Sequence, residues 1–276
     1  MSDDSADARR AVQIMGVVNA TPDSFSDGGV YLDAQAAVAH GLKLASDGAD
    51  ILDIGGESTR PGAEEVPLEL ELARTIPVIE GLRKKGCEAA ISIDTRKPDV
   101  ARAAVSAGAS IWNDVTALSF APDSLDTAMS LPCDIVLMHA QGDPKTMQRD
   151  PHYDDVVEEV YAYLARRIEA CVKAGVSEER LIVDPGIGFG KTLNHNLNLM
   201  AHLDRFCALG RPVLLGASRK RFIAALDREG PAKDRLGGSL AAVLSGFSRG
   251  ASIFRVHDVA ETRQALSVFS AIETVR

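Results

Sequence analysis

The chain has 276 residues, of which 46% are hydrophobic and 25% charged, and its formal net charge is −9. This is the composition of an ordinary globular protein, and the acidic balance excludes general nucleic-acid binding, which needs clustered Lys and Arg. The length suits either two small domains or one α/β barrel.

Residues 1–11 are polar and acidic and lack the apolar core of a signal peptide, so we expect a disordered leader, a single domain over 12–276 and a cytoplasmic location. No apolar run approaches the length of a transmembrane helix, so no membrane partner is expected. The four cysteines lie far apart without a CxxC pair, which is typical of buried thiols and not of zinc ligands or a disulfide framework.

Short apolar runs alternate along the chain with Ala- and Leu-rich segments of helical periodicity. In chain order we predict strand 12–18, helix 34–46, strand 50–54, helix 68–85, strand 89–93, helix 97–107, strands 110–113 and 134–138, helix 155–174, strand 181–184, helix 196–209, strand 213–216, helix 236–249, strand 252–256 and helix 259–273. Eight such units predict an α/β fold, a single (β/α)8 TIM barrel. A large doubly wound sheet is the alternative, but no GxGxxG motif follows the first strand.

All eight predicted strands end in polar or ionisable residues, and in such barrels the active site lies at the carboxyl ends of the strands. These residues include Asn19, Asp53, Asp94, Asn113, His139, Asp184, Ser218 and Arg255. Any one of them could cap a helix or solvate a loop, and we expect this of Thr95, Asp114 and Asp258. Eight convergent positions nevertheless predict a binding site.

Four of these side chains suit the edge of a base-like heterocycle. Asp94 and Asp184 are carboxylates between apolar strand residues, and buried carboxylates need partners such as ring N–H and amino donors. Asn113 offers a donor and an acceptor, and Lys220 can meet a ring oxygen or nitrogen. The alternative is that Asp94 and Asp184 form buried salt bridges with Arg96 and Lys220.

A second group suits an anion. Arg255 and His257 lie two residues apart on the last strand and its loop, and a guanidinium matches phosphate oxygens. Ser218 stands near the predicted start of a helix, where free N–H groups bind anions. No histidine spacing indicates a metal site made by protein alone, but Mg²⁺ shared with a phosphate group remains open.

Two long loops carry further polar groups. Residues 21–30 and 55–66 are rich in Gly and Pro and contain Phe25, Thr59 and Arg60. They could close over a reactive intermediate, or they could simply be solvated surface loops.

Nine segments resemble the dihydropteroate synthase family, in order and from about residue 12 to the C-terminus. The two most specific are MGVVNATPDSFSDGG at 15–29 and DILDIGGESTRPGA at 50–63. The resemblance implies a TIM barrel that joins p-aminobenzoate to 6-hydroxymethyl-7,8-dihydropterin pyrophosphate. It also implies folate biosynthesis, Mg²⁺, sulfonamide binding and a homodimer made through the last two helices.

The resemblance also assigns roles to individual residues. The pterin pocket would comprise Asp94, Asn113, Val115, Met138, Asp184, Phe189, Gly216, Lys220 and Arg255. Asn19, Thr59, Arg60, Arg255 and His257 would bind pyrophosphate, with Asn19 also meeting Mg²⁺. The p-aminobenzoate side would comprise Phe25, Thr59, Arg60, Pro61, Phe189, Ser218, Lys220 and Arg221. Catalysis would depend on Asp94, Lys220, Arg255 and His257.

One departure from the family lies at the expected site, whereas Ala140 and Asp143 in the loop after the fifth strand differ from commoner choices with little expected effect. Arg221 stands where many members have Ser, near the expected carboxylate of p-aminobenzoate. Two other interpretations remain: a pterin-binding methyltransferase barrel of the methyltetrahydrofolate kind, and a catalytically silent pterin-binding protein. The first should lack the two long loop motifs, and the second should have lost residues such as Asn19, Thr59 or Lys220.

Overall fold

The computed structural model describes residues 12–20, 29–58, 64–142 and 146–275. Within them eight parallel strands form one sheet in the order β6-β5-β4-β3-β2-β1-β8-β7. The strands are β1 (Gln13–Asn19), β2 (Ile51–Gly55), β3 (Ala90–Asp94), β4 (Ile111–Asp114), β5 (Asp134–Met138), β6 (Leu181–Asp184), β7 (Leu214–Leu215) and β8 (Ile253–Val256). A parallel bridge between Val183 and Val213 joins β6 to the β7 side. The sheet is therefore a barrel, as the sequence predicted.

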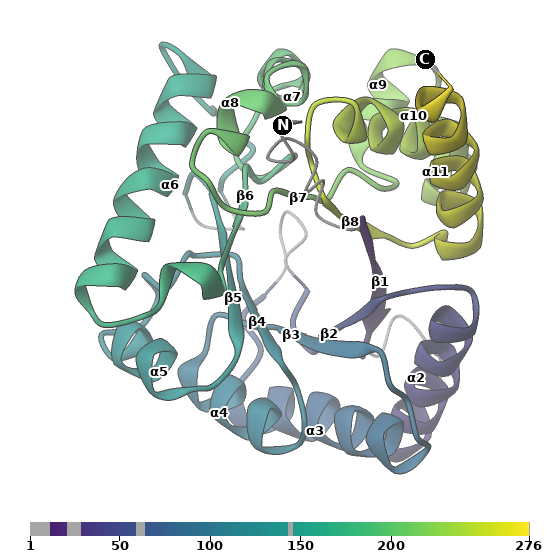
Figure 1. The fold of residues 1–276 in the computed structure, drawn as a ribbon. Helices are drawn as coiled ribbons and strands as arrows, with labels where there is room; N and C mark the ends of the chain where they lie inside the picture. The colour runs from purple at the N-terminus through teal and green to yellow at the C-terminus, as the bar shows by residue number, and fades with distance from the viewer. Residues whose placement is uncertain (1–11, 21–28, 59–63, 143–145, 276) are drawn as a thin grey trace, which may run out of the picture.

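Helices surround the ring of strands, and the strands converge on the middle of the view in Figure 1. They are α2 (Gly29–Ser46), α3 (Leu68–Lys84), α4 (Pro98–Ser106), α5 (Ser124–Ser130), α6 (Val156–Lys173), α7 (Leu193–Ala201), α8 (Leu203–Cys207), α9 (Arg221–Leu226), α10 (Leu236–Phe247) and α11 (Val259–Thr274). Short 3₁₀ turns cover Glu178–Arg180 and Ala232–Arg235. The described residues form no helix long and apolar enough to cross a membrane.

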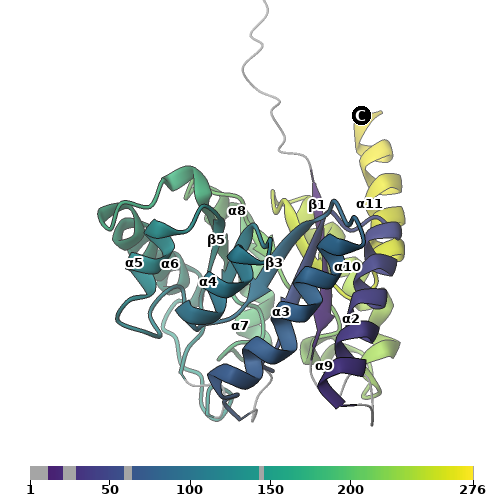
Figure 2. The same cartoon turned by 90° about the horizontal axis from the view of Figure 1, so that it is seen from below.

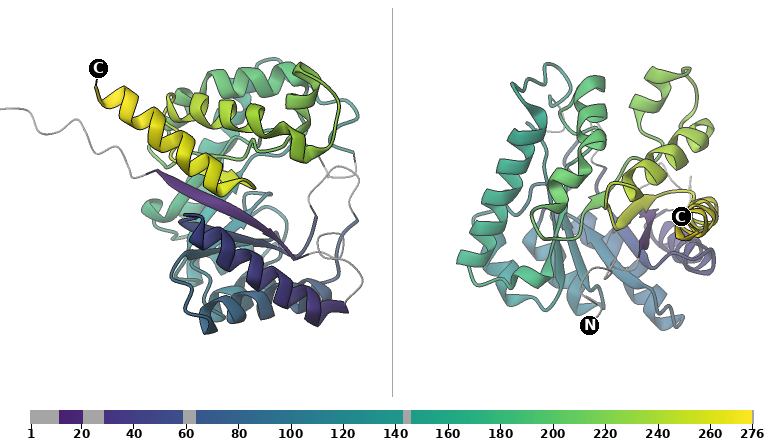
Figure 3. Two further views of the ribbon diagram at one scale, coloured as in Figure 1. Left: turned by 90° about the vertical axis from the view of Figure 1, so that its right-hand side faces the viewer. Right: turned by 45° about the horizontal axis from the view of Figure 1, so that its top comes forward.

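The core has two layers because strand residues alternate between the barrel interior and the helices. The inner cluster comprises Met15, Ile51, Ile111, Val136, Ile182, Leu214 and Ile253, one residue from each strand except β3. The larger outer cluster packs the other strand face against the helices, with Trp112, Phe206 and Phe254 among its fully buried side chains. Figure 3 shows this arrangement for β1, which lies between α2 and α11.

The inner layer determines which residues reach the site. Two residues beyond the apolar layer on β2, β4, β6 and β8, the same face carries the polar residues Asp53, Asn113, Asp184 and Arg255. The next inward step on β3 after Ser92 is Asp94. The alternation that builds the core therefore also points these polar side chains toward one rim of the barrel.

The predicted boundaries were wrong in several places, and α2 begins at Gly29 and not at residue 34 as expected. The helix expected at 196–209 is two helices, because the backbone of His202 (φ −118°, ψ 36°) leaves the helical conformation between α7 and α8. The strand expected at 213–216 covers only Leu214–Leu215, preceded by Pro212, which has no N–H for a strand ladder. Helices α5 and α9 were missed because runs of 7 and 6 residues are too short to show periodicity.

The helices that follow the strands lie along the outside of the barrel, as the side view in Figure 2 shows for α3 beside β3. The leader expected at 1–11 lies outside the described residues. So do Phe25, Thr59, Arg60 and Pro61, together with most of the two long loops in which they stand.

Candidate active site

Strand pairing brings the predicted pterin residues to one rim of the barrel. Gly55 on β2 is in register with Asp94 on β3, and Asp94 is in register with Asn113 on β4. Across β5 and β6, Met138 is in register with Asp184. Asp94, Asn113, Met138 and Asp184 are all buried, so this rim is a place where polar groups have little access to water.

Arg255 is the centre of the site. Its Nε donates to Asp53 Oδ2 at 2.6 Å, and its Nη2 donates to Asp94 Oδ2 at 2.8 Å. Asn113 Nδ2 lies 3.3 Å from the same Asp53 oxygen and 3.4 Å from Oδ1. One guanidinium from β8 therefore connects β2 and β3 and fixes the positions of two buried carboxylates.

Asp53 was predicted to lie at the strand ends, but the sequence analysis gave it no role in the site. It is fully buried within β2, whose other residues are Ile51, Leu52, Ile54 and Gly55. A charged residue in a short buried strand needs a partner, so this pattern was the available signal. What the sequence could not show is that the partner, Arg255, stands 202 positions away.

Burial raises the pKa of Asp94 to about 7, an effect that Arg255 opposes and that the carboxylates of Asp53 and Glu71 add to. A carboxyl that titrates near neutrality can bind ring N–H donors as an anion and remain sensitive to its surroundings. Burial also raises the pKa of Asp184, while Lys220 and the N–H of Gly186 lower it.

Lys220 forms the opposite wall of the site. Its Nζ donates to the carbonyl of Ile187 and lies 4.6 Å from the centre of the Phe189 ring. Burial lowers its pKa to about 8, against the attraction of Asp184. Asp184 itself accepts a 2.7 Å bond from Gly186 N. Lys220 and Asp184 are thus oriented by the loop after β6.

The salt bridges considered as an alternative are mostly absent from the described residues. Asp94 pairs with Arg255 and not with Arg96, which pairs with Glu57 and Glu65. That part of the alternative is wrong. Lys220 attracts Asp184 electrostatically, and its hydrogen bond goes to the carbonyl of Ile187.

The predicted anion-binding residues lie together at the ends of β7 and β8. Ser218 Oγ lies 3.0 Å from His257 Nδ1, and the backbone N–H of His257 donates to the same oxygen at 3.3 Å. Beside them, Arg219 has a positive φ of 58° and makes a two-bond ion pair with Asp258. These contacts hold the two loops in one arrangement near Arg255.

The remaining predicted residues are less constrained by contacts. Val115 and Asn19 are partly exposed after β4 and at the end of β1, and Gly216 is buried after β7. Arg221 is exposed at the first position of α9. Phe189 is partly exposed in the loop after β6.

The three polar residues expected to be structural have structural contacts. Asp114 accepts bonds from Thr116 N, Thr116 Oγ1 and Leu118 N. Asp258 pairs with Arg219, and Thr95 Oγ1 donates to Glu71.

Gly216 offers a direct test of the pterin pocket. A Cβ at this position would lie 3.8 Å from Arg255 Cβ and 4.0 Å from Asp184 Oδ2, which are ordinary contacts. We expect Gly216→Ala to leave the melting temperature unchanged and to weaken binding of a pterin analogue by about tenfold, because the methyl group occupies space between two pocket residues. Isothermal titration calorimetry measures this affinity.

The matched control is Gly237→Ala, since a Cβ on this α10 residue would have no atom within 4 Å. Equal affinities for the two variants would show that the face of Gly216 is not part of the pocket.

Within the described residues, no group of three or more His, Cys, Asp or Glu side chains is arranged to hold a metal ion. Among the described residues of this rim, the carboxylates of Asp53 and Asp94 are both bound to Arg255. Such a donor set fits an ion that keeps most of its ligands as water and phosphate oxygens, which is the habit of Mg²⁺.

Comparison with known proteins agrees with this geometry. The family described as pterin binding enzyme matches residues 15–257. The dihydropteroate synthase of Escherichia coli strain K12 is 48% identical over 258 residues, covering 94% of this chain and 90% of that protein.

Two solved structures have nearly the same fold as this chain. The dihydropteroate synthase of Xanthomonas albilineans with 4-aminobenzoic acid has a TM-score of 0.91 and 52% identity, covering 97% of this chain and 95% of that one. The dihydropteroate synthase of Yersinia pestis in a sulfonamide drug complex has a TM-score of 0.90 and 40% identity, covering 99% of both chains.

Proposed function

The chain belongs to the dihydropteroate synthases, within the pterin-binding enzymes, and on this premise we propose how its residues divide the reaction. The enzyme joins p-aminobenzoate to 6-hydroxymethyl-7,8-dihydropterin pyrophosphate, forming 7,8-dihydropteroate and releasing pyrophosphate. The named relatives favour this activity over the methyltransferase and the silent pterin-binding protein. The observation that carries the proposed roles is the meeting of Asp94, Asn113, Asp184 and Lys220 around Arg255 at one rim.

The buried carboxylates bind the pterin. Asp94 and Asp184 accept from ring N–H and amino groups, while Asn113 supplies an amide edge and Lys220 a donor. The bond that breaks joins the pterin methylene carbon to the pyrophosphate oxygen. As that carbon becomes cationic, the negative charges of Asp94 and Asp184 stabilise it at short range.

The departing pyrophosphate is stabilised at β8. Arg255 and His257 face the leaving group from the strand end, and Ser218 orients the His257 ring through its 3.0 Å contact. Bound Mg²⁺, met by Asn19, would neutralise part of the charge that grows on the pyrophosphate. The amino nitrogen of p-aminobenzoate then bonds to the methylene carbon and loses its proton to solvent.

The second substrate lies toward Lys220 and Phe189. The ammonium of Lys220 and the ring of Phe189 form one surface beside the pterin pocket, and Ser218 lies at the loop that follows β7. Arg221 is exposed beside Lys220 and can attract the carboxylate of p-aminobenzoate in place of a serine hydroxyl. We assign Phe25, Thr59, Arg60 and Pro61, which lie outside the described residues, to the same substrate by family resemblance, and we expect sulfonamides to compete with p-aminobenzoate.

A homodimer through α10 and α11 and a cytoplasmic location complete the proposal. Val268 and Ile272, one turn apart on α11, are 57% and 54% exposed, which is unusual for large aliphatic side chains and suits an interface.

The activity is tested by pyrophosphate release from purified protein. We expect net release only when the pterin pyrophosphate, p-aminobenzoate and Mg²⁺ are all present, because departure of pyrophosphate is reversible until the amine captures the cationic carbon, and Mg²⁺ would neutralise the charge of the leaving group. Chromatography of 7,8-dihydropteroate and pyrophosphate in the quenched mixture measures it, with each component omitted in turn as the control, because a coupling pyrophosphatase would itself need Mg²⁺. No release from the complete mixture would contradict the proposed activity, and full release without Mg²⁺ would remove the metal from it.

A further inference from the structure

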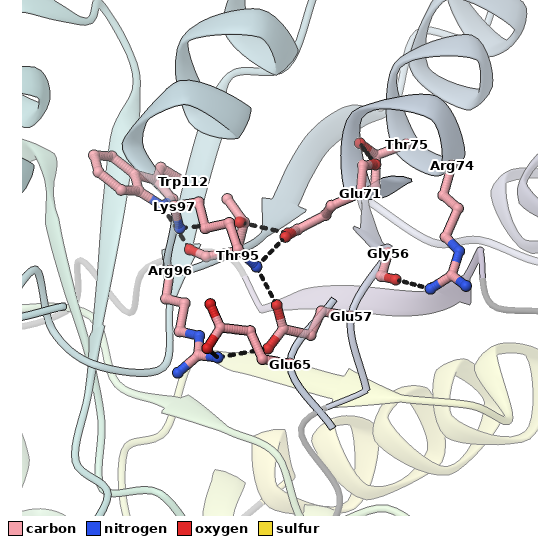
Figure 4. Close-up of polar contacts among 10 residues, drawn as sticks. All are labelled: Gly56, Glu57, Glu65, Glu71, Arg74, Thr75, Thr95, Arg96, Lys97 and Trp112. Carbon is pink, nitrogen blue, oxygen red and sulfur yellow. Dashed lines mark hydrogen bonds and ion pairs between the residues drawn. The ribbon is translucent and has the colours of Figure 1, made fainter. Parts of the chain in front are cut away.

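A network of buried charged side chains lies beside the site and takes no part in the proposed chemistry. Lys97 Nζ contacts Glu57 and donates to Glu71 Oε2 at 2.6 Å, and Arg96 Nη2 donates to Glu57 Oε1 at 2.9 Å. Thr95 Oγ1 donates to Glu71 Oε1 at 2.6 Å. Figure 4 shows Glu57 between Arg96 and Lys97, with Lys97 reaching on to Glu71.

This network of charged side chains connects three loops at the carboxyl ends of the strands. Glu57 follows β2 and Glu71 lies in α3, whereas Arg96 and Lys97 follow β3. Arg96 also lies over the ring of Phe120 at 4.3 Å, in the connection after β4. The charges therefore act between neighbouring βα units and not within one of them.

Arg96 holds both described ends of the β2–α3 connection. Its Nη2 contacts Glu57 at 2.9 Å on the side that leaves β2, and Glu65 at 3.4 Å on the side that enters α3. Arg74 adds a second attachment by donating to the carbonyl of Gly56 at 2.9 Å. As Figure 4 shows, Glu57 and Glu65 approach the same guanidinium.

Stability alone does not explain this cluster. Glu71 is fully buried, and the side chains of Glu57, Lys97 and Arg96 are 11%, 10% and 14% exposed. Removing so many charges from water costs about as much as the ion pairs return. Arg96 Nε is also buried without a hydrogen-bond partner among the described residues, which costs further free energy.

From this arrangement we infer that Arg96 and Glu57 are positioning residues for the second substrate, fixing the ends of the β2–α3 connection relative to β3. The inference rests on the proposed function, in which that connection belongs to the p-aminobenzoate side of the site. The pterin side has its own support, because Arg255 and the strand register hold Asp94 and Asn113 independently.

The test is steady-state kinetics of Arg96→Gln and Glu57→Gln. Each removes one side of the pair, and Lys97 keeps Glu71 as a partner in the second variant. We expect the KM for p-aminobenzoate to rise about tenfold, equivalent to about 1.4 kcal/mol, with kcat and the KM for the pterin pyrophosphate within about twofold of wild type. The double variant should show less than the product of the single effects, because both substitutions break the shared Arg96–Glu57 contact while each also removes a contact of its own, with Glu65 or Lys97.

The matched control is Arg102→Gln. Arg102 also makes ion pairs beside α4, with Asp99 and Asp123, but its side chain is 42% exposed and contacts no residue of the site. Its kinetic constants should equal those of wild type.

Other results would overturn the inference. An unchanged KM for p-aminobenzoate, equal changes for both substrates, or effects that multiply in the double variant would each show a purely structural role. Wild-type protein that releases no pyrophosphate would remove the proposed function and the inference with it. Active wild type with unaltered variants would remove the inference alone.

Discussion

Replacing Asp94 by asparagine should lower kcat by about 10²- to 10³-fold while leaving the protein folded. The carboxylate is placed where positive charge develops on the pterin, and the amide keeps its shape but not its charge. The side-chain amide of Asn also presents a hydrogen-bond donor where the pterin presents one, so the two groups cannot pair. Initial rates of pyrophosphate release at saturating substrates measure the effect.

Stability should change little in this variant, because two effects oppose each other. The folded-state pKa of Asp94 lies above the ordinary value, so its ionised form costs stability at pH 8, and the amide removes that cost. Against this, Arg255 loses one partner but keeps Asp53 at 2.6 Å. We expect the melting temperature to move by no more than a few degrees.

Because the pKa of Asp94 is raised, we also expect pterin binding to depend on pH. With a pKa of about 7, Asp94 is an acceptor above neutrality and becomes protonated as the pH falls. The affinity for a pterin analogue should therefore decrease as the pH falls below 7, and the loss should approach tenfold per pH unit. This pH dependence should be absent in Asp94→Asn.

Asp134→Asn is the matched control, since Asp134 begins β5 at the opposite end of the barrel. Full activity in Asp94→Asn, or an unchanged pH profile, would remove Asp94 from the site.

The comparison of sequence and structure shows where prediction works in this fold. Buried parallel strands are continuous apolar runs, so all eight were located to within one or two residues. Because parallel strands align their carboxyl ends, Asp94, Asn113 and Asp184 could be placed at one rim before any coordinates were known. Both inferences use regularities that are local in the chain.

Pairings between distant residues could not be predicted. Asp94 has Arg96 two positions away as an obvious partner, yet it binds Arg255, because Asp94 faces the barrel interior and Arg96 turns to Glu57. Which cation meets which carboxylate depends on the register of β8 against β1, and this is set by the whole barrel. The same reason explains why Asp53 was given no role in the sequence analysis.

Arg255→Lys should lower kcat/KM for the pterin pyrophosphate by about 10²-fold, although the positive charge is kept. The guanidinium reaches Asp53 through Nε and Asp94 through Nη2, and a single ammonium cannot make both contacts in that geometry. One buried carboxylate would lose its partner, so we also expect a fall in melting temperature of about 4–8 °C, from about 2 kcal/mol.

Arg263→Lys separates the two effects, because Arg263 donates to both Gly48 O and Asp50 Oδ2 at the amino ends of the strands. This control should keep wild-type kinetics and lose less stability than Arg255→Lys, because both of its contacts use the single nitrogen Nη2 and the side chains of Arg263 and Asp50 are 36% and 38% exposed. If Arg255→Lys lost stability but kept its kcat/KM, the guanidinium would serve only to pair Asp53 with Asp94. A loss of kcat/KM in Arg255→Lys alone would instead place the guanidinium fork in contact with substrate, because both variants exchange an ion-paired arginine for lysine and only one of them lies at the rim.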